Sequence, residues 1–177
     1  MQMFLVLIAA LSSAFAGAGI AYGLRRLIGE RIPKWFVPAG AGLAMILTTI
    51  SLEYSWARGV MATLPSDTVM IATREQRAAW QPWTYVKPWI KGFVAVTPSE
   101  TVETVEGSGQ WVVQTRLHER WQPAIIKPIL VDCTTPARAE IFPTTSFDAD
   151  GRAENADWLA VSADDPLIAV VCPTLGG

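Results

Sequence analysis

The two cysteines, Cys133 and Cys172, are the residues whose chemistry is easiest to derive from this sequence. Each follows an apolar stretch and precedes a turn, in Cys-Thr-Thr-Pro and Cys-Pro-Thr. They form no Cys-x-x-Cys motif and have no histidine nearby, which disfavours a redox-active or metal-binding pair. In an oxidising compartment, such a pair is expected to form a disulfide. Closing this loop of about 40 residues would stabilise the fold by roughly 4 kcal/mol in the chain-entropy account.

His118 is the only histidine of the chain, and it lies in the charged segment Arg-Leu-His-Glu-Arg. A histidine that acts as a general base needs an orienting partner and a bound substrate. Neither is indicated here, so we expect an ordinary exposed or edge histidine. A single histidine also disfavours a histidine-based metal site.

Four carboxylates surround Gly151 in the segment 147–157, FDADGRAENAD. Alternating carboxylates before a glycine can bind calcium, but position 152 is an arginine and no glutamate closes the loop at the required place. We expect a solvated turn. The sequence also lacks a phosphate-binding glycine loop, a nucleophile elbow, a zinc motif and a haem-attachment motif. It therefore predicts neither a cofactor nor a catalytic residue, and the chain is not expected to be an enzyme.

The chain that positions the cysteines, the histidine and the carboxylates has two parts that differ in their content of charged residues. The chain has 177 residues, of which 51% are hydrophobic and only 17% are charged, whereas a soluble domain is about one quarter charged. Only six of the first 56 residues are charged. Residues 57–177 carry 10 basic and 14 acidic residues, a net charge of −4, which argues against nucleic-acid binding. One membrane module and one globular domain are therefore expected.

Two segments, 3–24 and 35–56, are long and apolar enough to cross a bilayer. The first contains no charge over 22 residues, which is roughly 33 Å of helix. A cleaved signal peptide is the competing interpretation, because residues 13–16 offer a small-x-small site. No basic residue precedes the segment, and its apolar run continues past Ala16, so an uncleaved helix is favoured. Aromatic residues bracket the second segment, as expected at the two membrane surfaces.

The loop between these segments, residues 25–34, predicts the orientation of the chain. It contains Arg25, Arg26, Arg31 and Lys34, and short basic loops stay on the cytoplasmic side. The helices then form a hairpin with both termini and the C-terminal domain on the opposite side, against which only Arg58 argues. We expect a bacterial inner-membrane protein with a periplasmic domain, where Cys133 and Cys172 would be oxidised.

Small residues recur at four-residue spacing in both helices, which allows close helix packing in lipid. One interpretation is that they pack the two helices against each other. The other is that at least one face binds another membrane protein, because the first segment has more small faces than one partner needs. The residues concerned are Ser13, Gly17 and Ala21; Ala10, Ala14 and Ala18; Gly19 and Gly23; Pro38 and Gly42; and Gly40 and Ala44.

Residues 78–93, AAWQPWTYVKPWIKGF, are unusually aromatic and contain two prolines and two lysines. Three interpretations remain open. The segment fills the core of the domain or lines its edge, lies at the membrane–water boundary, or forms a contact surface for a partner. The candidate interface residues are Trp80, Trp83, Tyr85 and Trp89.

Beyond a linker at 57–67, short β-like segments dominate residues 68–177. Strands are expected at 68–73, 92–97, 101–106, 110–117, 124–131 and 167–172, with a possible helical turn at 74–80. Gly107-Ser108-Gly109 indicates a hairpin, and Pro128 predicts an edge or bulged strand. No helix of ten residues is expected. The predicted fold is a membrane-anchored α+β chain, in which a two-helix hairpin precedes a small, mainly antiparallel β domain, a sandwich or a partly open barrel.

The function that fits these patterns best is a non-catalytic accessory, structural or assembly subunit of a bacterial inner-membrane complex. Its partners would be the lipid bilayer and other inner-membrane subunits. The alternative is a periplasmic ligand-binding or sensing module, which predicts a pocket built from tryptophans. A third class, a hydrolase or transferase that uses scattered carboxylates, predicts two carboxyl groups facing each other in a cleft.

Overall fold

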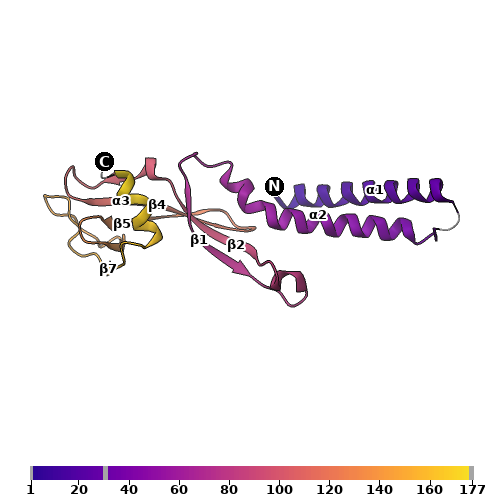
Figure 1. The fold of residues 1–177 in the computed structure, drawn as a ribbon. Helices are drawn as coiled ribbons and strands as arrows, with labels where there is room; N and C mark the ends of the chain where they lie inside the picture. The colour runs from indigo at the N-terminus through magenta and orange to yellow at the C-terminus, as the bar shows by residue number, and fades with distance from the viewer. Residues whose placement is uncertain (1, 30–31, 176–177) are drawn as a thin grey trace. The chain divides into compact units, whose positions relative to one another are not determined.

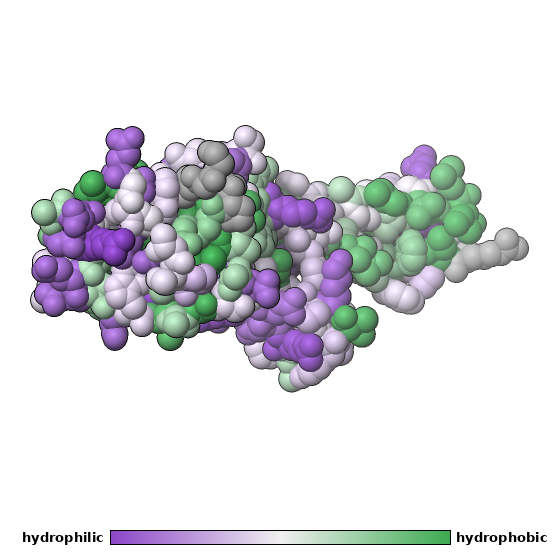
Figure 2. Space-filling model, turned by 60° about the vertical axis from the view of Figure 1, so that its left-hand side comes forward, coloured by the Kyte–Doolittle hydropathy of each residue, from purple (hydrophilic) through white to green (hydrophobic). Residues whose placement is uncertain are grey.

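The computed structural model describes residues 2–29 and 32–175, which form two compact units, residues 1–58 and 59–177. The first unit is a pair of long helices, α1 (Gln2–Ile28) and α2 (Phe36–Met61) (Figure 1). The spans Met3–Ile28 and Phe36–Met61 are each long and apolar enough to cross a membrane. Their side chains are mostly exposed and give the helices a predominantly hydrophobic surface (Figure 2).

Both helices are longer than the sequence analysis predicted. Leu27 and Ile28 continue the apolar pattern of α1, so Arg25 and Arg26 lie in its last turn rather than in the loop. Gly29 then ends the helix: its N–H still donates to the carbonyl of Arg25 at 2.9 Å, and its positive φ of 86° turns the following chain out of the helical path. The connection is correspondingly shorter than the predicted loop 25–34.

The second unit is built on one antiparallel sheet that curls into a half-barrel. Its strands run in the order β1 (Val69–Gln76), β2 (Trp89–Val96), β4 (Gln110–Glu119), β5 (Ile125–Asp132), β6 (Ala137–Glu140) and β7 (Leu159–Ala160). The short β3 (Val102–Glu103) pairs with the first half of β4, and two 3-10 turns, η1 (Pro82–Tyr85) and η2 (Pro98–Glu100), flank β2. The sheet is closer to the predicted partly open barrel than to a sandwich.

The C-terminal segment differs from the prediction, because residues 167–172 lie in helix α3 (Pro166–Leu175) and not in a strand. Pro166 occupies the first turn, where a missing N–H costs little. The carboxylate of Asp165 accepts a hydrogen bond from the N–H of Leu167 at 2.9 Å and caps the helix. The prediction that no helix of ten residues occurs in this domain was therefore wrong.

The main core of the second unit lies between α3 and one face of the sheet. Val96 of β2, Val113 of β4 and Val131 of β5 form the sheet side of this core. Leu167, Ile168 and Val171 of α3 pack on them, and Figure 1 shows α3 lying over the strands. The three helix residues are spaced so that they share one helical face, which explains why a continuous apolar run forms a helix here.

Two further strand predictions need correction. Residues 74–76, predicted as part of a helical turn, continue β1. Pro128 lies inside β5, which has neighbours on both sides, but β6 pairs only with Ile129–Asp132. The proline therefore stands just beyond the end of the β6 pairing, where a missing N–H breaks no ladder bond to that strand.

Candidate functional sites

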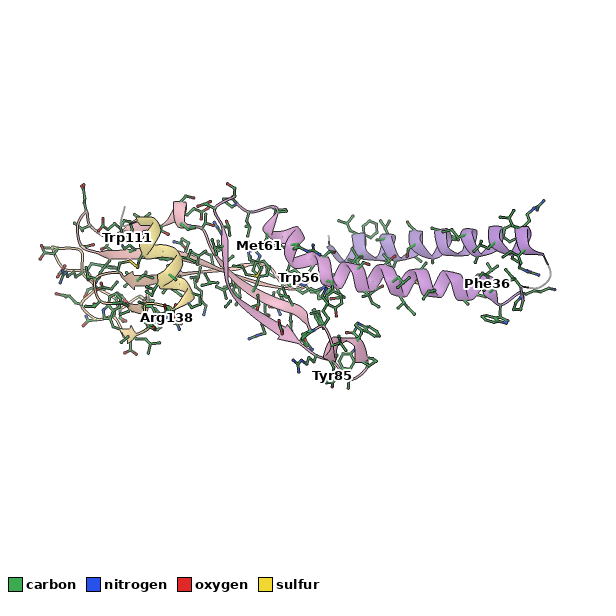
Figure 3. All side chains as sticks on the ribbon, viewed as in Figure 1. Phe36, Trp56, Met61, Tyr85, Trp111 and Arg138 are labelled. Carbon is green, nitrogen blue, oxygen red and sulfur yellow. A yellow bond between two sulfur atoms is a disulfide. The ribbon has the colours of Figure 1, made fainter. Side chains whose placement is uncertain are left out.

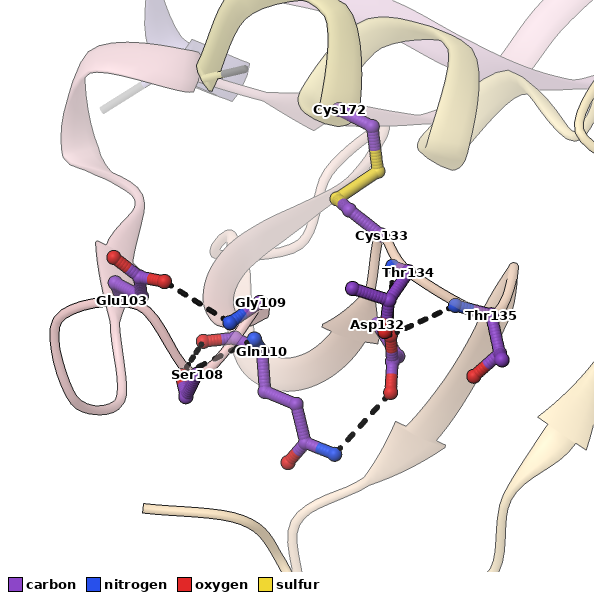
Figure 4. Close-up of a disulfide and its surroundings, with 9 residues drawn as sticks. All are labelled: Glu103, Ser108, Gly109, Gln110, Asp132, Cys133, Thr134, Thr135 and Cys172. Carbon is purple, nitrogen blue, oxygen red and sulfur yellow. Dashed lines mark hydrogen bonds between the residues drawn. A yellow bond between two sulfur atoms is a disulfide. The ribbon is translucent and has the colours of Figure 1, made fainter. Parts of the chain in front are cut away.

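The disulfide between Cys133 and Cys172 joins the turn after β5 to helix α3 (Figure 4). The two Cα atoms lie 5.6 Å apart, and the bond links positions separated by 39 residues. Both cysteines pack against the core cluster. The structure therefore confirms the predicted pair, and the bond holds the helix on the sheet that it covers.

Asp132 fixes the backbone on the sheet side of this disulfide. Its Oδ1 accepts hydrogen bonds from the N–H groups of Thr134 at 2.8 Å and Thr135 at 3.0 Å, and from the hydroxyl of Thr134 (Figure 4). Its Oδ2 accepts a bond from the amide of Gln110 at 3.3 Å. Partial burial acts to raise the pKa of the Asp132 carboxyl, but these hydrogen bonds outweigh it, and the pKa lies below its ordinary value.

The neighbouring β3–β4 loop completes this frame. The N–H of Cys133 donates to the carbonyl of Gly109 at 3.1 Å, and the N–H of Gly109 donates to the carboxylate of Glu103 at 3.0 Å. Gly109 has a φ of 72°, and a Cβ there would come within 2.9 Å of Thr134. These hydrogen bonds hold the backbone on both sides of Cys133, and so they restrain the disulfide.

The aromatic segment forms the tip of the ribbon made by β1 and β2. Its 3-10 turn, η1, carries Trp83 and Tyr85, and Figure 3 shows Tyr85 at this end of the ribbon. Thr84 is fully buried inside the tip, where its hydroxyl donates to the carbonyl of Gln81 at 2.7 Å and accepts the N–H of Ala78 at 2.9 Å. Small residues thus occupy the interior of the tip.

The large side chains of the tip point outward. Trp80 is 78% exposed, Tyr85 58% and Val86 90%, and Trp83 is also exposed. Trp89, at the start of β2, is half-buried. The interpretation that this segment fills the core is therefore wrong for the tip, whereas Phe93 further along β2 is buried as a core residue.

His118 lies on β4 with its ring stacked on Phe93 of β2 at a centroid distance of 4.9 Å. Burial and the positive charge of Arg116 lower its pKa below the ordinary value of 6.5. Among the described residues, none forms a hydrogen bond with its buried Nε2. The ring of His118 is thus partly buried within the sheet and lacks the exposed environment that the sequence predicts.

The acidic segment at 147–157 forms a turn that Asp148 stabilises. The carboxylate of Asp148 accepts the N–H of Arg152 at 2.7 Å, and Gly151 adopts a φ of 74°. In the part of the chain that the structure describes, no group of three or more histidine, cysteine or acidic side chains is placed to hold a metal ion. The segment has the geometry of the predicted Asp/Gly turn.

Gly17 and Ala21 of α1 face Gly40 and Ala44 of α2. A Cβ on Gly17 would come within 2.5 Å of both the Cβ of Ala44 and the carbonyl oxygen of Gly40, and one on Gly40 within 2.7 Å of the Cβ of Ala21. The backbones are in contact because these positions lack bulk.

The opposite face of α1 is open. At 100° per residue, Gly19 and Gly23 lie about 180° around the helix from the pair formed by Gly17 and Ala21. Among the described residues, and apart from the neighbouring backbone of α1 itself, a Cβ at either position would meet no atom within 4 Å. Exposed Ser12 and Ala16, which the sequence analysis did not single out, fall on the same side. Ser13 lies beside the packed face, and its hydroxyl donates to the carbonyl of Ala10 at 2.8 Å.

The residues that predict the orientation are spread over the end of the helix pair. Arg25 and Arg26 are on α1, and the Nε of Arg25 donates to the carbonyl of Ile32 at 3.2 Å. Lys34 is exposed in the connection. Arg31 lies outside the described residues.

A shallow pocket on the sheet is lined by β1, β2 and β4, from Ala72 to Glu119. Its volume is about 180 Å³, below the range of about 300–1,000 Å³ that is typical of ligand sites. No tryptophan lines it. The pocket therefore lacks the feature that a ligand-binding module was expected to show.

No protein-family model, curated protein sequence or solved structure matches this chain.

Proposed function

We propose that this chain is a non-catalytic accessory or assembly subunit of a bacterial inner-membrane complex. In this proposal α1 and α2 span the membrane as a hairpin, the connection between them is cytoplasmic, and residues 59–177 lie in the periplasm. The basic residues near the connection support the orientation. The disulfide is consistent with an oxidising compartment.

The observation that carries the proposal is that α1 has two small-residue faces and α2 occupies only one of them. Gly17 and Ala21 are covered by α2, whereas space is open beside Gly19 and Gly23. In lipid there is no hydrophobic force to bring helices together, so close packing on small faces is a main source of helix association. The open face of α1 is thus suited to a helix from another subunit.

The proposal is tested by purifying the full chain from its native membrane in a mild detergent and identifying co-purified proteins by mass spectrometry. We expect other membrane proteins in stoichiometric amounts and a native-gel band of larger apparent mass, and therefore lower mobility, than that of the single chain. Replacing both Gly19 and Gly23 by leucine should release these proteins while leaving the α1–α2 contact intact, since no described atom of α2 lies within 4 Å of either added Cβ.

Ile20→Phe is the matched control, because it adds bulk to an exposed position about a quarter-turn away from the open face. It should retain the partners. A single chain that co-purifies with nothing, or partners that are retained by the double leucine variant, would contradict the proposal.

A further inference from the structure

The tip of the β1–β2 ribbon has its side chains distributed in the opposite way to a water-soluble hairpin. The polar Thr84 is fully buried and hydrogen-bonded, and the small Ala78 is buried beside it. Trp80, Tyr85 and Val86 are the exposed residues. The hydroxyl of Thr84 and the backbone bonds of η1 hold the turn in place. The large apolar side chains therefore protrude from a defined scaffold.

We propose that this tip, residues 77–87, is a membrane-interface anchor that inserts Trp80, Tyr85 and Val86 into the headgroup region of a bilayer containing anionic lipids. The proposal adds a second membrane contact to the helix pair. It rests on the membrane anchoring that forms part of the proposed function.

The chemistry of the exposed side chains favours a lipid surface as the occupant. Tryptophan and tyrosine combine an apolar ring with a polar atom, and they concentrate where hydrocarbon meets water. Lysine and arginine next to them can place their stems in the apolar layer and their charges among the headgroups. The exposed side chains of Trp80, Tyr85 and Val86 can enter a fluid interface without a complementary pocket.

The distribution of charge also matches an anionic surface. Residues 77–87 contain two basic residues, Arg77 and Lys87, and no acidic residue, a net charge of +2. The rest of residues 57–177 contains eight basic and fourteen acidic residues, a net charge of −6. Anionic headgroups attract the tip and repel the remainder of the domain, within a Debye length of the surface.

The tip is covalently connected to α2, and this connection favours its contact with the bilayer even where the contact itself is weak. Only residues 62–68 separate α2 from β1, and seven residues extend to at most about 24 Å. The ribbon itself, with eight residues in each strand, is about 26 Å long. The connection allows the tip to return to the bilayer surface, and attachment through α2 keeps the effective concentration of that surface high.

The test places a nitroxide label on the full chain in nanodiscs and compares its collisions with oxygen, which dissolves in the bilayer, and with a water-soluble nickel complex. Val86→Cys reports on the tip. Val102→Cys, which is 64% exposed on β3, is the matched control in the domain. Leu47→Cys on α2 reports on the helix pair. The native cysteines are in a disulfide and do not react with the label.

We expect oxygen collisions to dominate at positions 47 and 86 and nickel collisions to dominate at 102. Adding Trp80→Ser and Tyr85→Ser should return the label at 86 to water, and removing anionic lipid should make it shallower. A label at 86 that is as nickel-accessible as that at 102 overturns the proposal. A label at position 86 that is shielded from both oxygen and nickel also overturns the proposal, because this result indicates a protein partner.

The label on α2 separates the two possible failures. If position 47 is in hydrocarbon and position 86 is in water, the helix anchor stands and only the tip proposal fails. If position 47 is in water, the membrane anchoring fails as well. A label at 86 whose depth does not change with anionic lipid overturns the electrostatic part of the proposal.

Discussion

His118 shows how much the neighbours of one side chain decide its chemistry. The sequence places it in a charged segment, yet its ring is stacked on Phe93 and its Nε2 is buried. Protonation would place a charged N–H in this site, beside the positive charge of Arg116, without an acceptor for Nε2 among the described residues. Burial and Arg116 therefore lower the pKa of His118 and favour the neutral ring.

This environment predicts how stability depends on pH. Because the folded pKa is lower than the unfolded value of about 6.5, the unfolded chain binds more protons between the two pKa values. The neutral ring makes its full contribution to the free energy of unfolding above the unfolded pKa. This contribution is lost as the pH falls toward the folded pKa. We expect the urea midpoint to decrease between pH 7.5 and pH 5.5, and His118→Gln to reduce this decrease.

The pKa itself can be followed by NMR of the imidazole protons, which are unambiguous because the chain has one histidine. A titration midpoint at or above 6.5 would contradict the buried environment. An unchanged pH dependence of the urea midpoint in the glutamine variant would show that another group is responsible.

Thr84 and Trp80 mark a limit of prediction at the level of single residues. Composition and propensity favour burying tryptophan and exposing threonine. The structure reverses both, because the turn of η1 brings the hydroxyl of Thr84 to the backbone of Ala78 and Gln81. That closure depends on three-dimensional turn geometry, so the sequence left three interpretations of this segment open.

At the level of elements, the cysteine pair was predictable, whereas the element that carries Cys172 was not recognised. An apolar run of six residues fits a buried strand and a buried helix equally well. The discriminating signal was the preceding Asp165-Pro166, a cap followed by a first-turn proline. Periodicity alone could not distinguish the two, because all of residues 167–172 are apolar.

The two faces of α1 give a prediction about helix packing. A side chain at Gly17 would collide with Gly40 and Ala44, whereas one at Gly19 would enter open space. We expect Gly17→Leu to lengthen the distance between spin labels at Leu11 and Leu47 by about 2 Å, or to broaden its distribution, as the helices move toward an ordinary spacing. The distance is measured by pulsed electron–electron double resonance on the full chain in nanodiscs.

Gly19→Leu is the matched control, because it makes the same change two residues away on the opposite face. Its label distance should equal that of the unsubstituted chain. Equal effects of the two substitutions would mean that bulk anywhere on α1 disturbs the pair, and that the contact at Gly17 is not specific.

At the level of the whole molecule, the two units differ in the way that a membrane anchor and an aqueous domain differ. The helix pair exposes apolar side chains along both helices and has positive charge near its connection. The second unit has a buried core and a disulfide. This contrast was predictable because it depends on composition and spacing rather than on contacts between distant residues.

The proposed orientation predicts which parts of the chain are reachable from outside an intact cell. Lys34→Cys lies in the connection between the helices and Val102→Cys in the domain, and both positions are exposed. The outer membrane is first permeabilised while the inner membrane stays closed, and a membrane-impermeant maleimide is then added. If the connection is cytoplasmic, the reagent should label position 102 in these cells, and position 34 only after the cells are lysed. The unsubstituted chain should remain unlabelled throughout, because Cys133 and Cys172 are joined.

Labelling of position 34 but not of position 102 in cells with an intact inner membrane would show the opposite orientation. Labelling of the unsubstituted chain in intact cells would show that the two cysteines are reduced in that compartment. Either result would contradict the placement of the domain in an oxidising periplasm, because the basic connection and the disulfide both lead to that placement.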